Sequence, residues 1–192
     1  TITAVDGYIQ NATLSDSLGK TAKYSSNGQY TFSSTPTYPL TLTGGELEST
    51  GVPFDITMTT QSGSTVISPI TTFLASDSSL LSKLSALGLG ASSLDDFSKD
   101  YISSNDLNLA KLSQVLYLIL KDDNLASNFK TSLKSNSLKD LDEFYTLAET
   151  NIDATMGSNA TNYKNMLTAV KSYSGHPADF ETTLKTHKET IT

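Results

Sequence analysis

The hydrophobic pattern of this chain changes its period once, within residues 39–75, and that change constrains the fold more than any other feature. Before this stretch, polar and apolar residues alternate, with many Thr, Tyr and Gly; after it, apolar residues recur every three or four positions. A period of two is typical of strands, and a period near 3.6 is typical of helices. The sequence therefore predicts an α+β protein, with a small antiparallel β-sandwich over residues 1–67 and a helical bundle over residues 68–192.

Turn signals divide the first part into short β-prone runs. Asn27-Gly28 lies between the runs 21–24 and 29–32, and an Asn-Gly pair in that position is the strongest short-range signal for a hairpin. Residues 40–42 and 54–58 alternate between polar and apolar side chains, as half-buried strands do. Short strands at regular spacing indicate a small sandwich.

Helix start signals divide the second part. Ser68 can cap a helix whose first residue is Pro69, a position where the missing N–H of proline costs nothing. The periodicity predicts helices over residues 69–75, 78–87, 93–103, 106–121, 124–134, 138–150, 159–173 and 177–189. The helix over 106–121 is expected at the centre of the bundle, because one apolar stripe runs through Leu109, Leu112, Leu116 and Ile119.

Composition restricts the partners and the location of the protein. The net charge is −7, and all 13 basic residues are Lys. An acidic surface repels phosphate backbones, and Arg is the usual residue for bidentate phosphate and base contacts, so no nucleic-acid partner is expected. No apolar run approaches the ~20 residues that span a bilayer, so no membrane span is expected. The absence of Cys excludes disulfides and thiolate metal sites, and the Ser-, Thr-, Asn- and Tyr-rich composition favours an extracellular or cell-surface location.

Three motifs stand out in the β-prone part: Val5-Asp6-Gly7-Tyr8-Ile9, Asn11-Ala12-Thr13-Leu14 and Ser26-Asn27-Gly28-Gln29-Tyr30-Thr31-Phe32. They resemble the start of a transthyretin-like (carboxypeptidase regulatory-like) β-sandwich. The continuation over residues 43–73 is similar to a segment of large bacterial cell-surface and secreted proteins that leads into a helical region. The resemblance covers about the first 75 residues. It implies a sandwich fold and a role as an adhesive, spacer or matrix module.

Catalytic signals are weak. Gly19-Lys20-Thr21 lacks the first glycine of a phosphate-binding loop, because position 14 is Leu14. Only two histidines, His176 and His187, could serve as a base for a serine nucleophile, and no G-x-S-x-G elbow is present. Paired carboxylates acting as a glycosidase remain the one open enzymatic alternative. We therefore expect a protein that is not an enzyme and holds no cofactor, with calcium as the exception considered next.

Glu46 and Glu48 are candidate calcium ligands. They follow Gly44-Gly45 in a loop and, with Asp55 or Asp6, could supply the hard oxygen ligands that calcium requires. A solvated loop without a metal is the alternative.

Two non-enzymatic functions remain open. The first is a structural or adhesive protein of a cell surface, matrix or filament, which binds further copies of itself or other surface proteins. In that hypothesis the N-terminal run, through Ile2 and Val5, adds a strand to the sheet edge of a neighbouring copy. The second is a carbohydrate- or ligand-binding module whose site combines Glu46, Glu48 and Tyr38 from the sandwich loops. Tyr38 and other tyrosines would stack on a sugar, with cross-strand packing as the alternative for these rings. Sequons at Asn11 and Asn159 are possible glycosylation sites.

Overall fold

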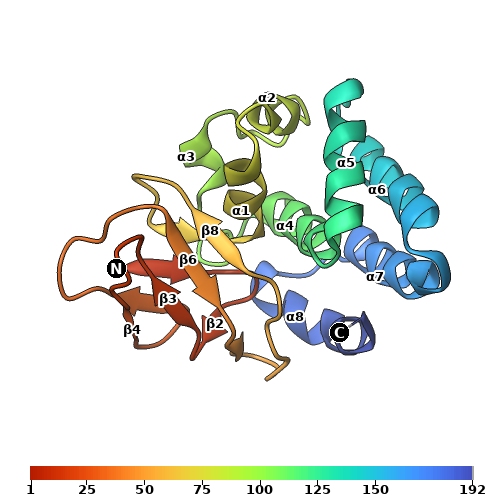
Figure 1. The fold of residues 1–192 in the computed structure, drawn as a ribbon. Helices are drawn as coiled ribbons and strands as arrows, with labels where there is room; N and C mark the ends of the chain where they lie inside the picture. The colour runs from red at the N-terminus through yellow and green to blue at the C-terminus, as the bar shows by residue number, and fades with distance from the viewer. Residues whose placement is uncertain (192) are drawn as a thin grey trace.

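The computed structural model describes residues 1–191, and its strands precede its helices, which confirms the α+β order (Figure 1). The strands are β1 (Ile2–Ala4), β2 (Ile9–Gln10), β3 (Thr13–Ser15), β4 (Lys23–Tyr24), β5 (Gln29–Thr31), β6 (Leu40–Thr43), β7 (Glu46–Leu47), β8 (Met58–Thr60) and β9 (Val66–Ile67). The helices are α1 (Pro69–Ser76), α2 (Leu80–Ser85), α3 (Leu94–Phe97), α4 (Leu107–Leu120), α5 (Asp123–Ser135), α6 (Leu141–Thr155), α7 (Ala160–Ser172) and α8 (Phe180–Ile191). Short 3₁₀ turns at Gly157–Asn159 and Pro177–Asp179 precede α7 and α8.

The strands form three sheets, in the orders β4-β5-β1-β9, β3-β6-β8 and β2-β7. The hairpin predicted at Asn27-Gly28 is confirmed, since β4 and β5 pair antiparallel on either side of it. The sandwich was expected to be wholly antiparallel, and one pair departs from this. β1 pairs antiparallel with β5 and parallel with β9, so that Ala4 lies opposite Ile67. A parallel pair needs a long connection, and here the rest of the β part provides it.

The hairpin turn depends on a glycine. Asn27 and Gly28 both have positive φ angles, of 50° and 68°. A Cβ atom on Gly28 would lie 2.5 Å from the carbonyl oxygen of Ala4. Only glycine therefore lets the turn approach the central strand β1 this closely.

The predicted start of α1 is confirmed in its atomic detail. The Ser68 hydroxyl accepts a hydrogen bond from the Thr71 amide at 3.2 Å, and the Thr71 hydroxyl accepts one from the Ser68 amide at 2.9 Å. This reciprocal capping box satisfies two amides that a helix start leaves without partners. Pro69 occupies the first helical turn, as expected.

Two predicted helices have different ends. The helix expected over 93–103 stops at Phe97, because the following segment turns around Asp100, whose Oδ1 accepts from the amides of Ile102 and Ser103. The helix expected over 138–150 starts at Leu141 and continues to Thr155. Its cap is Asp140, which accepts from the Glu143 amide at 2.8 Å.

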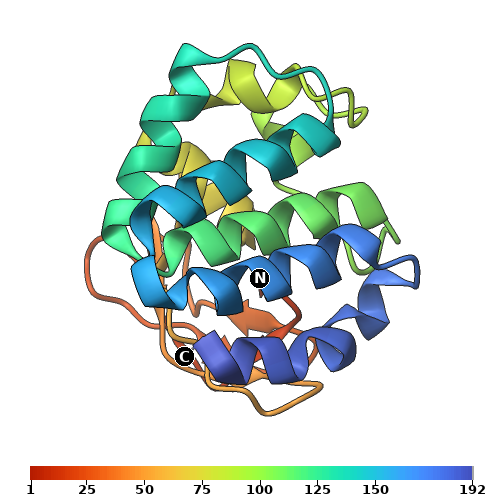
Figure 2. The ribbon, with the colours of Figure 1, turned by 90° about the vertical axis from the view of Figure 1, so that its right-hand side faces the viewer.

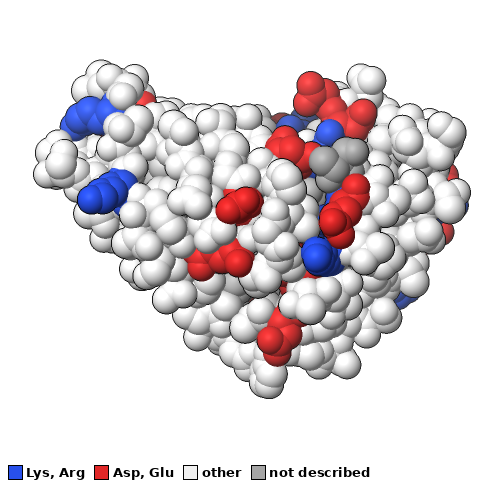
Figure 3. Space-filling view, turned by 90° about the horizontal axis from the view of Figure 1, so that it is seen from below, with Lys and Arg blue, Asp and Glu red and all other residues white. Residues whose placement is uncertain are grey.

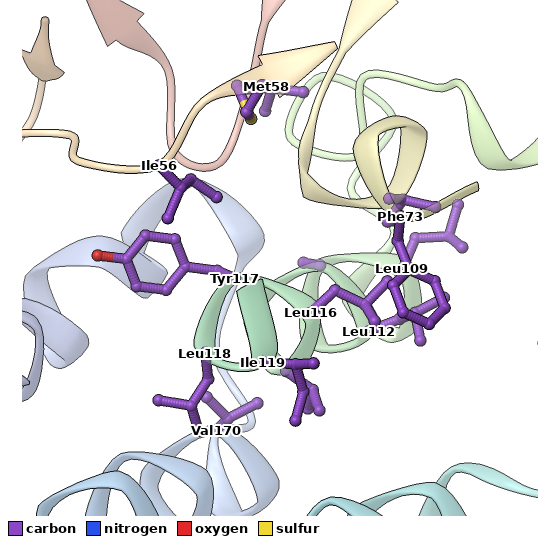
Figure 4. Close-up of a cluster of buried hydrophobic side chains, with 14 of the residues drawn as sticks. Ile56, Met58, Phe73, Leu109, Leu112, Leu116, Tyr117, Leu118, Ile119 and Val170 are labelled. Carbon is purple, nitrogen blue, oxygen red and sulfur yellow. The ribbon is translucent and has the colours of Figure 1, made fainter. Parts of the chain in front are cut away.

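The hydrophobic core is continuous across the boundary predicted at residue 67. α4 occupies its centre, as expected from its apolar stripe, with the β part on one side and α7 on another (Figures 1 and 2). In Figure 4, Tyr117 of α4 lies toward Ile56, while Leu118 lies toward Val170 of α7. The ring centroids of Phe54 and Tyr117 are 6.0 Å apart. The boundary therefore marks a change of secondary structure, and the side chains of both parts share one interior.

Within residues 1–191, no helix combines the length and the apolar character needed to cross a bilayer.

Candidate functional site

A cluster of buried charged side chains joins the end of β1 to α8. Asp6 directly follows β1, and Glu181 and Lys188 both lie on α8. Their exposed fractions are 2%, 3% and 0%. Charged side chains are almost never buried this completely unless they are paired. We refer to them as the Asp6–Glu181–Lys188 cluster.

The periodicity of α8 brings its two charged residues to the same interior face. Glu181, Leu184 and Lys188 are spaced by three and then four positions, and such residues lie on one side of a helix. Phe180 and Leu184 are buried beside them, and the Phe180 ring stacks on Tyr173 at a centroid distance of 4.2 Å. The hydrophobic docking of α8 thus carries one amine and one carboxyl group into the core.

Short contacts connect the three side chains. Nζ of Lys188 donates to Oδ2 of Asp6 at 2.6 Å and to Oε1 of Glu181 at 2.9 Å. It also lies 2.9 Å from Oε2 of Glu181. The amide of Gly7 donates to Oε1 of Glu181 at 3.0 Å. One amine therefore faces two carboxyl groups, and the backbone next to Asp6 binds the second of them.

The side chains around the cluster come mainly from α4. Nε2 of Gln114 lies 3.0 Å from Oδ1 of Asp6, from the Asp6 carbonyl oxygen and from Oε1 of Glu181. The hydroxyl of Tyr101 donates to the Asp6 carbonyl oxygen at 2.5 Å. Nζ of Lys188 lies 4.2 Å from the centroid of the Tyr117 ring, a cation–π distance. The amine thus has an aromatic face on one side and carboxyl groups on the other.

Burial and the unequal number of charges determine the protonation of the cluster. Burial raises the pKa of Asp6 from 3.8 to about 7, against the opposing effect of the Lys188 ammonium group. Burial alone would lower the pKa of Lys188, but the two carboxylates outweigh it and raise that pKa above its ordinary value. With both carboxyl groups ionised, the cluster would carry a net negative charge in a medium that solvates charge poorly. With a pKa of about 7, Asp6 therefore gains or loses its proton near neutral pH.

A surface hollow adjoins the cluster. Its volume is about 270 Å³, and it is lined by Gly7, Tyr8, Glu48, Ser49, Ile102, Pro177, Ala178 and Glu181. Because Glu181 belongs to both the hollow and the cluster, it lies between the buried amine and the surface. Of the three side chains in the cluster, Glu181 is the one that lines this hollow.

The structure gives protein partners to the four predicted calcium ligands. Glu46 accepts from the side chain of Gln10 at 2.8 Å, across the β2–β7 pair. Glu48 accepts from the Tyr24 hydroxyl at 2.6 Å and from the Gly28 amide at 2.7 Å. The other two candidates are also paired, Asp55 with Lys121 and Asp6 with Lys188. Within residues 1–191, no group of three or more His, Cys, Asp or Glu side chains is arranged to hold a metal ion. Calcium binding at Glu46 and Glu48 stays a prediction.

The predicted assembly residues lie inside the sheet. Ile2 and Val5 are 3% and 0% exposed, and β1 already has β5 and β9 as neighbours. In this structure β1 could therefore join a neighbouring copy only by leaving its own sheet, and assembly through Ile2 and Val5 stays a prediction. The edge strands of that sheet are β4 and β9.

Tyr38, the predicted ligand-stacking residue, is half-buried, and its hydroxyl donates to the Ser64 carbonyl oxygen at 2.6 Å. It lines a hollow of about 430 Å³ together with Phe32, Ser34 and Thr35. Glu48 lines the different hollow beside the cluster. The structure therefore does not combine Tyr38 with Glu48 in one site.

Sequence reasoning missed the partnership of Asp6, Glu181 and Lys188. Asp6 was considered as part of a family-like motif and as a possible calcium ligand, and no buried charge was expected in the helix over residues 177–189. One signal was available: Glu181 and Lys188 share a helix face with Leu184, so two charged residues occupy the apolar stripe.

Comparisons with known protein families, with curated proteins and with solved structures find no match to this chain. The resemblance of residues 1–75 to a transthyretin-like sandwich therefore stays a prediction.

Proposed function

We propose that this protein is a non-enzymatic structural or adhesive module of a cell surface, an extracellular matrix or a filament. Its partners would be further copies of itself or other surface proteins. The observation that carries this proposal is the Asp6–Glu181–Lys188 cluster. Hydrogen bonds between its buried side chains, and from the Gly7 amide, join the end of β1 to α8. Such contacts between distant parts of the chain are expected in a protein with a structural role.

The surface of the protein is compatible with this role. Figure 3 shows a face that is largely uncharged, on which acidic side chains gather in the middle and right of the view with lysines beside them, while other lysines lie at the left. A net charge of −7 keeps individual copies soluble, whereas Ser, Thr and Tyr side chains allow hydrogen-bonded contacts. Contacts between copies would then use the edge strands, of which β4 is one.

The experiment is light scattering of the purified chain over a concentration series, with calcium and with a chelator. We expect oligomers that grow with concentration. The variant Tyr24→Pro on the edge strand β4 should assemble less, because the Tyr24 amide points away from β5 and proline removes that donor. The matched control is Ser137→Pro, in the exposed segment before α6, where the preceding Asn136 is already extended. A chain that stays monomeric at every concentration, with or without calcium, would contradict self-assembly.

A carbohydrate-binding module is the second candidate, and the hollow beside Tyr38 favours it. The lining of this hollow includes two aromatic residues, Phe32 and Tyr38, and four Ser or Thr residues: Thr1, Ser34, Thr35 and Thr65. Sugars are recognised by such a combination of ring faces and hydroxyl groups. The test is a glycan array probed with the wild-type chain and with Tyr38→Ala. Binding that is lost in the variant supports the candidate, and an array without signal for the wild type excludes the glycans tested.

A further inference from the structure

The Asp6–Glu181–Lys188 cluster places an amine and a carboxyl group in contact inside the protein. Nζ of Lys188 lies 2.6 Å from Oδ2 of Asp6, and neither side chain is exposed. We propose that these two side chains condense to an amide, so that a covalent cross-link joins Asp6 to Lys188, and that Glu181 carries the protons. This inference does not depend on the surface role proposed above.

Proximity makes this reaction feasible. An amine and a carboxyl group free in water do not condense at a useful rate, because they rarely meet in the right geometry and because water favours hydrolysis. Reacting groups held in a fixed orientation behave as if present at about 10⁵–10⁸ M. Here the packing of α8 fixes the position of Lys188, and the turn after β1 fixes that of Asp6. Burial of both side chains excludes solvent from the amide that forms.

The charge state of the cluster favours the protonated carboxyl group, although the two carboxylates also raise the pKa of Lys188 and so oppose loss of its proton. Attack requires a neutral amine and a protonated carboxyl group, which are normally a poor combination near neutral pH. Two carboxyl groups share one ammonium group here, and burial raises the pKa of Asp6 to about 7. Transfer of a proton from Lys188 to Asp6 replaces two buried charges by two neutral groups, so the interior lowers the cost of reaching the reactive state.

The protons and bonds balance without any other reactant. The Glu181 carboxylate takes one proton from the Lys188 ammonium group and passes it to Oδ2 of Asp6. The neutral Nζ then attacks Cγ of Asp6 and forms the C–N bond. Glu181 moves a second proton from Nζ to Oδ2, the Cγ–Oδ2 bond breaks, and Oδ2 leaves as water. The amide keeps one proton on Nζ and Oδ1 as its carbonyl oxygen, and Glu181 ends as a carboxylate.

Each oxygen of the Asp6 carboxyl group already has the neighbour that its role requires. Oδ1, on which negative charge develops during attack, accepts from Nε2 of Gln114 at 3.0 Å. A donor placed there stabilises the tetrahedral intermediate in the way an oxyanion hole does. Oδ2, the leaving oxygen, lies on the amine side, and both oxygens of Glu181 lie 2.9 Å from Nζ.

The product removes much of the cost of burying the cluster. Three charges are buried before reaction, and one remains on Glu181 afterwards. That carboxylate keeps the Gly7 amide and Gln114 as donors. Glu181, beside which the water is released, lines the adjoining hollow.

Another dehydration at the same residue has to be distinguished. Asp6 precedes Gly7, and the Gly7 nitrogen could in principle attack Cγ of Asp6 to give a cyclic imide with the same loss of mass. In the folded chain the Gly7 amide donates to Oε1 of Glu181, so this nitrogen is engaged elsewhere. The two products differ in what they join: the imide lies within one peptide, whereas the amide links two peptides.

The experiment is intact-mass measurement of the full chain, recovered unfolded and followed after refolding, with peptide mapping after proteolysis. We expect a mass lower than that of the sequence by one water molecule, and a linked pair of peptides that contain Asp6 and Lys188. Lys188→Arg keeps a positive charge but cannot form this amide, and it should retain the full mass. Glu181→Gln keeps the shape but loses the proton carrier, and its cross-linking should be slower by about 10²–10⁴-fold.

A wild-type chain that folds and keeps the full mass would overturn the proposal, and this result needs no variant. A loss of water that persists in Lys188→Arg, or that maps to a single peptide, would also overturn it, because it would identify the imide. Cross-linking of Glu181→Gln at the wild-type rate would overturn the role assigned to Glu181.

Discussion

Replacing Phe54 with Ala tests whether residues 1–67 and the helices fold as one unit. Phe54 belongs to the β part, is 3% exposed, and packs on the ring of Tyr117 in α4. Truncating a buried Phe to Ala costs about 3–5 kcal/mol, from lost burial and from the cavity that remains. The continuity of the core leaves little room for collapse, so we expect about 4 kcal/mol. That is a large part of the roughly 5–15 kcal/mol that stabilises a typical domain.

The helices report on this change, because they all follow residue 68. Urea unfolding is followed by far-UV circular dichroism, which helices dominate. With a slope of about 2.5 kcal/mol per molar urea, a loss of about 4 kcal/mol moves the midpoint down by about 1.6 M. The control is Leu18→Ala, in the same part of the chain, because Leu18 is 72% exposed. Its effect should stay within about 0.5 kcal/mol.

The result that would refute this reasoning is a helical transition at the wild-type urea concentration in Phe54→Ala. The helices would then be stable without the β part, and the shared core would contribute nothing to their stability.

Three further predictions concern the residues that fix the sheets, the first helix and the cluster. Tyr30→Phe should cost about 1–3 kcal/mol in thermal or urea unfolding, because the buried Tyr30 hydroxyl donates to the Ile9 carbonyl and accepts from the Ala12 amide, and both groups would lose their partner; an unchanged midpoint would contradict this. Ser68→Ala should cost about 1 kcal/mol, because it removes the cap of α1, whereas Ser68→Thr should recover part of that loss. In freshly refolded chain, before any amide forms, unfolding free energy should fall as the pH rises from about 5 to about 8, because folded Asp6 holds its proton up to a pKa of about 7 and unfolded Asp6 releases it near 3.8. Urea midpoints that rise over this interval would be inconsistent with the buried carboxyl group.

The parts of the fold that local sequence determines were predictable. Asn27-Gly28 specifies a hairpin through its own backbone angles, and Ser68-Pro69 specifies a helix start through a cap and a fixed φ. The α4 stripe identifies the central helix, because periodic burial follows from helix geometry alone. These features need no information from distant residues.

The remaining features depend on distant residues. The parallel pairing of β1 with β9 joins Thr3 to Val66, and no local pattern encodes which strand becomes the neighbour of another. The cluster joins positions 182 apart in the chain. Asp6 in an Asp-Gly pair has the composition of an ordinary turn, so only the position of α8 reveals that its partner is Lys188. Sequence predicted the helices well, and it could not predict which charges they bring together.

The distance along the chain between Asp6 and Lys188 also sets an order of events during synthesis. Lys188 is made 182 residues after Asp6, which takes about 10–40 s at roughly 5–20 residues per second. Throughout that interval the β part can form its hairpins, but Asp6 and the Gly7 amide have no α8 to cover them. This part of the interior is covered only after α8 has been synthesised. A chain that lacks α8 would keep a charged group facing an open core, so the cluster distinguishes copies that contain α8 from copies that lack it.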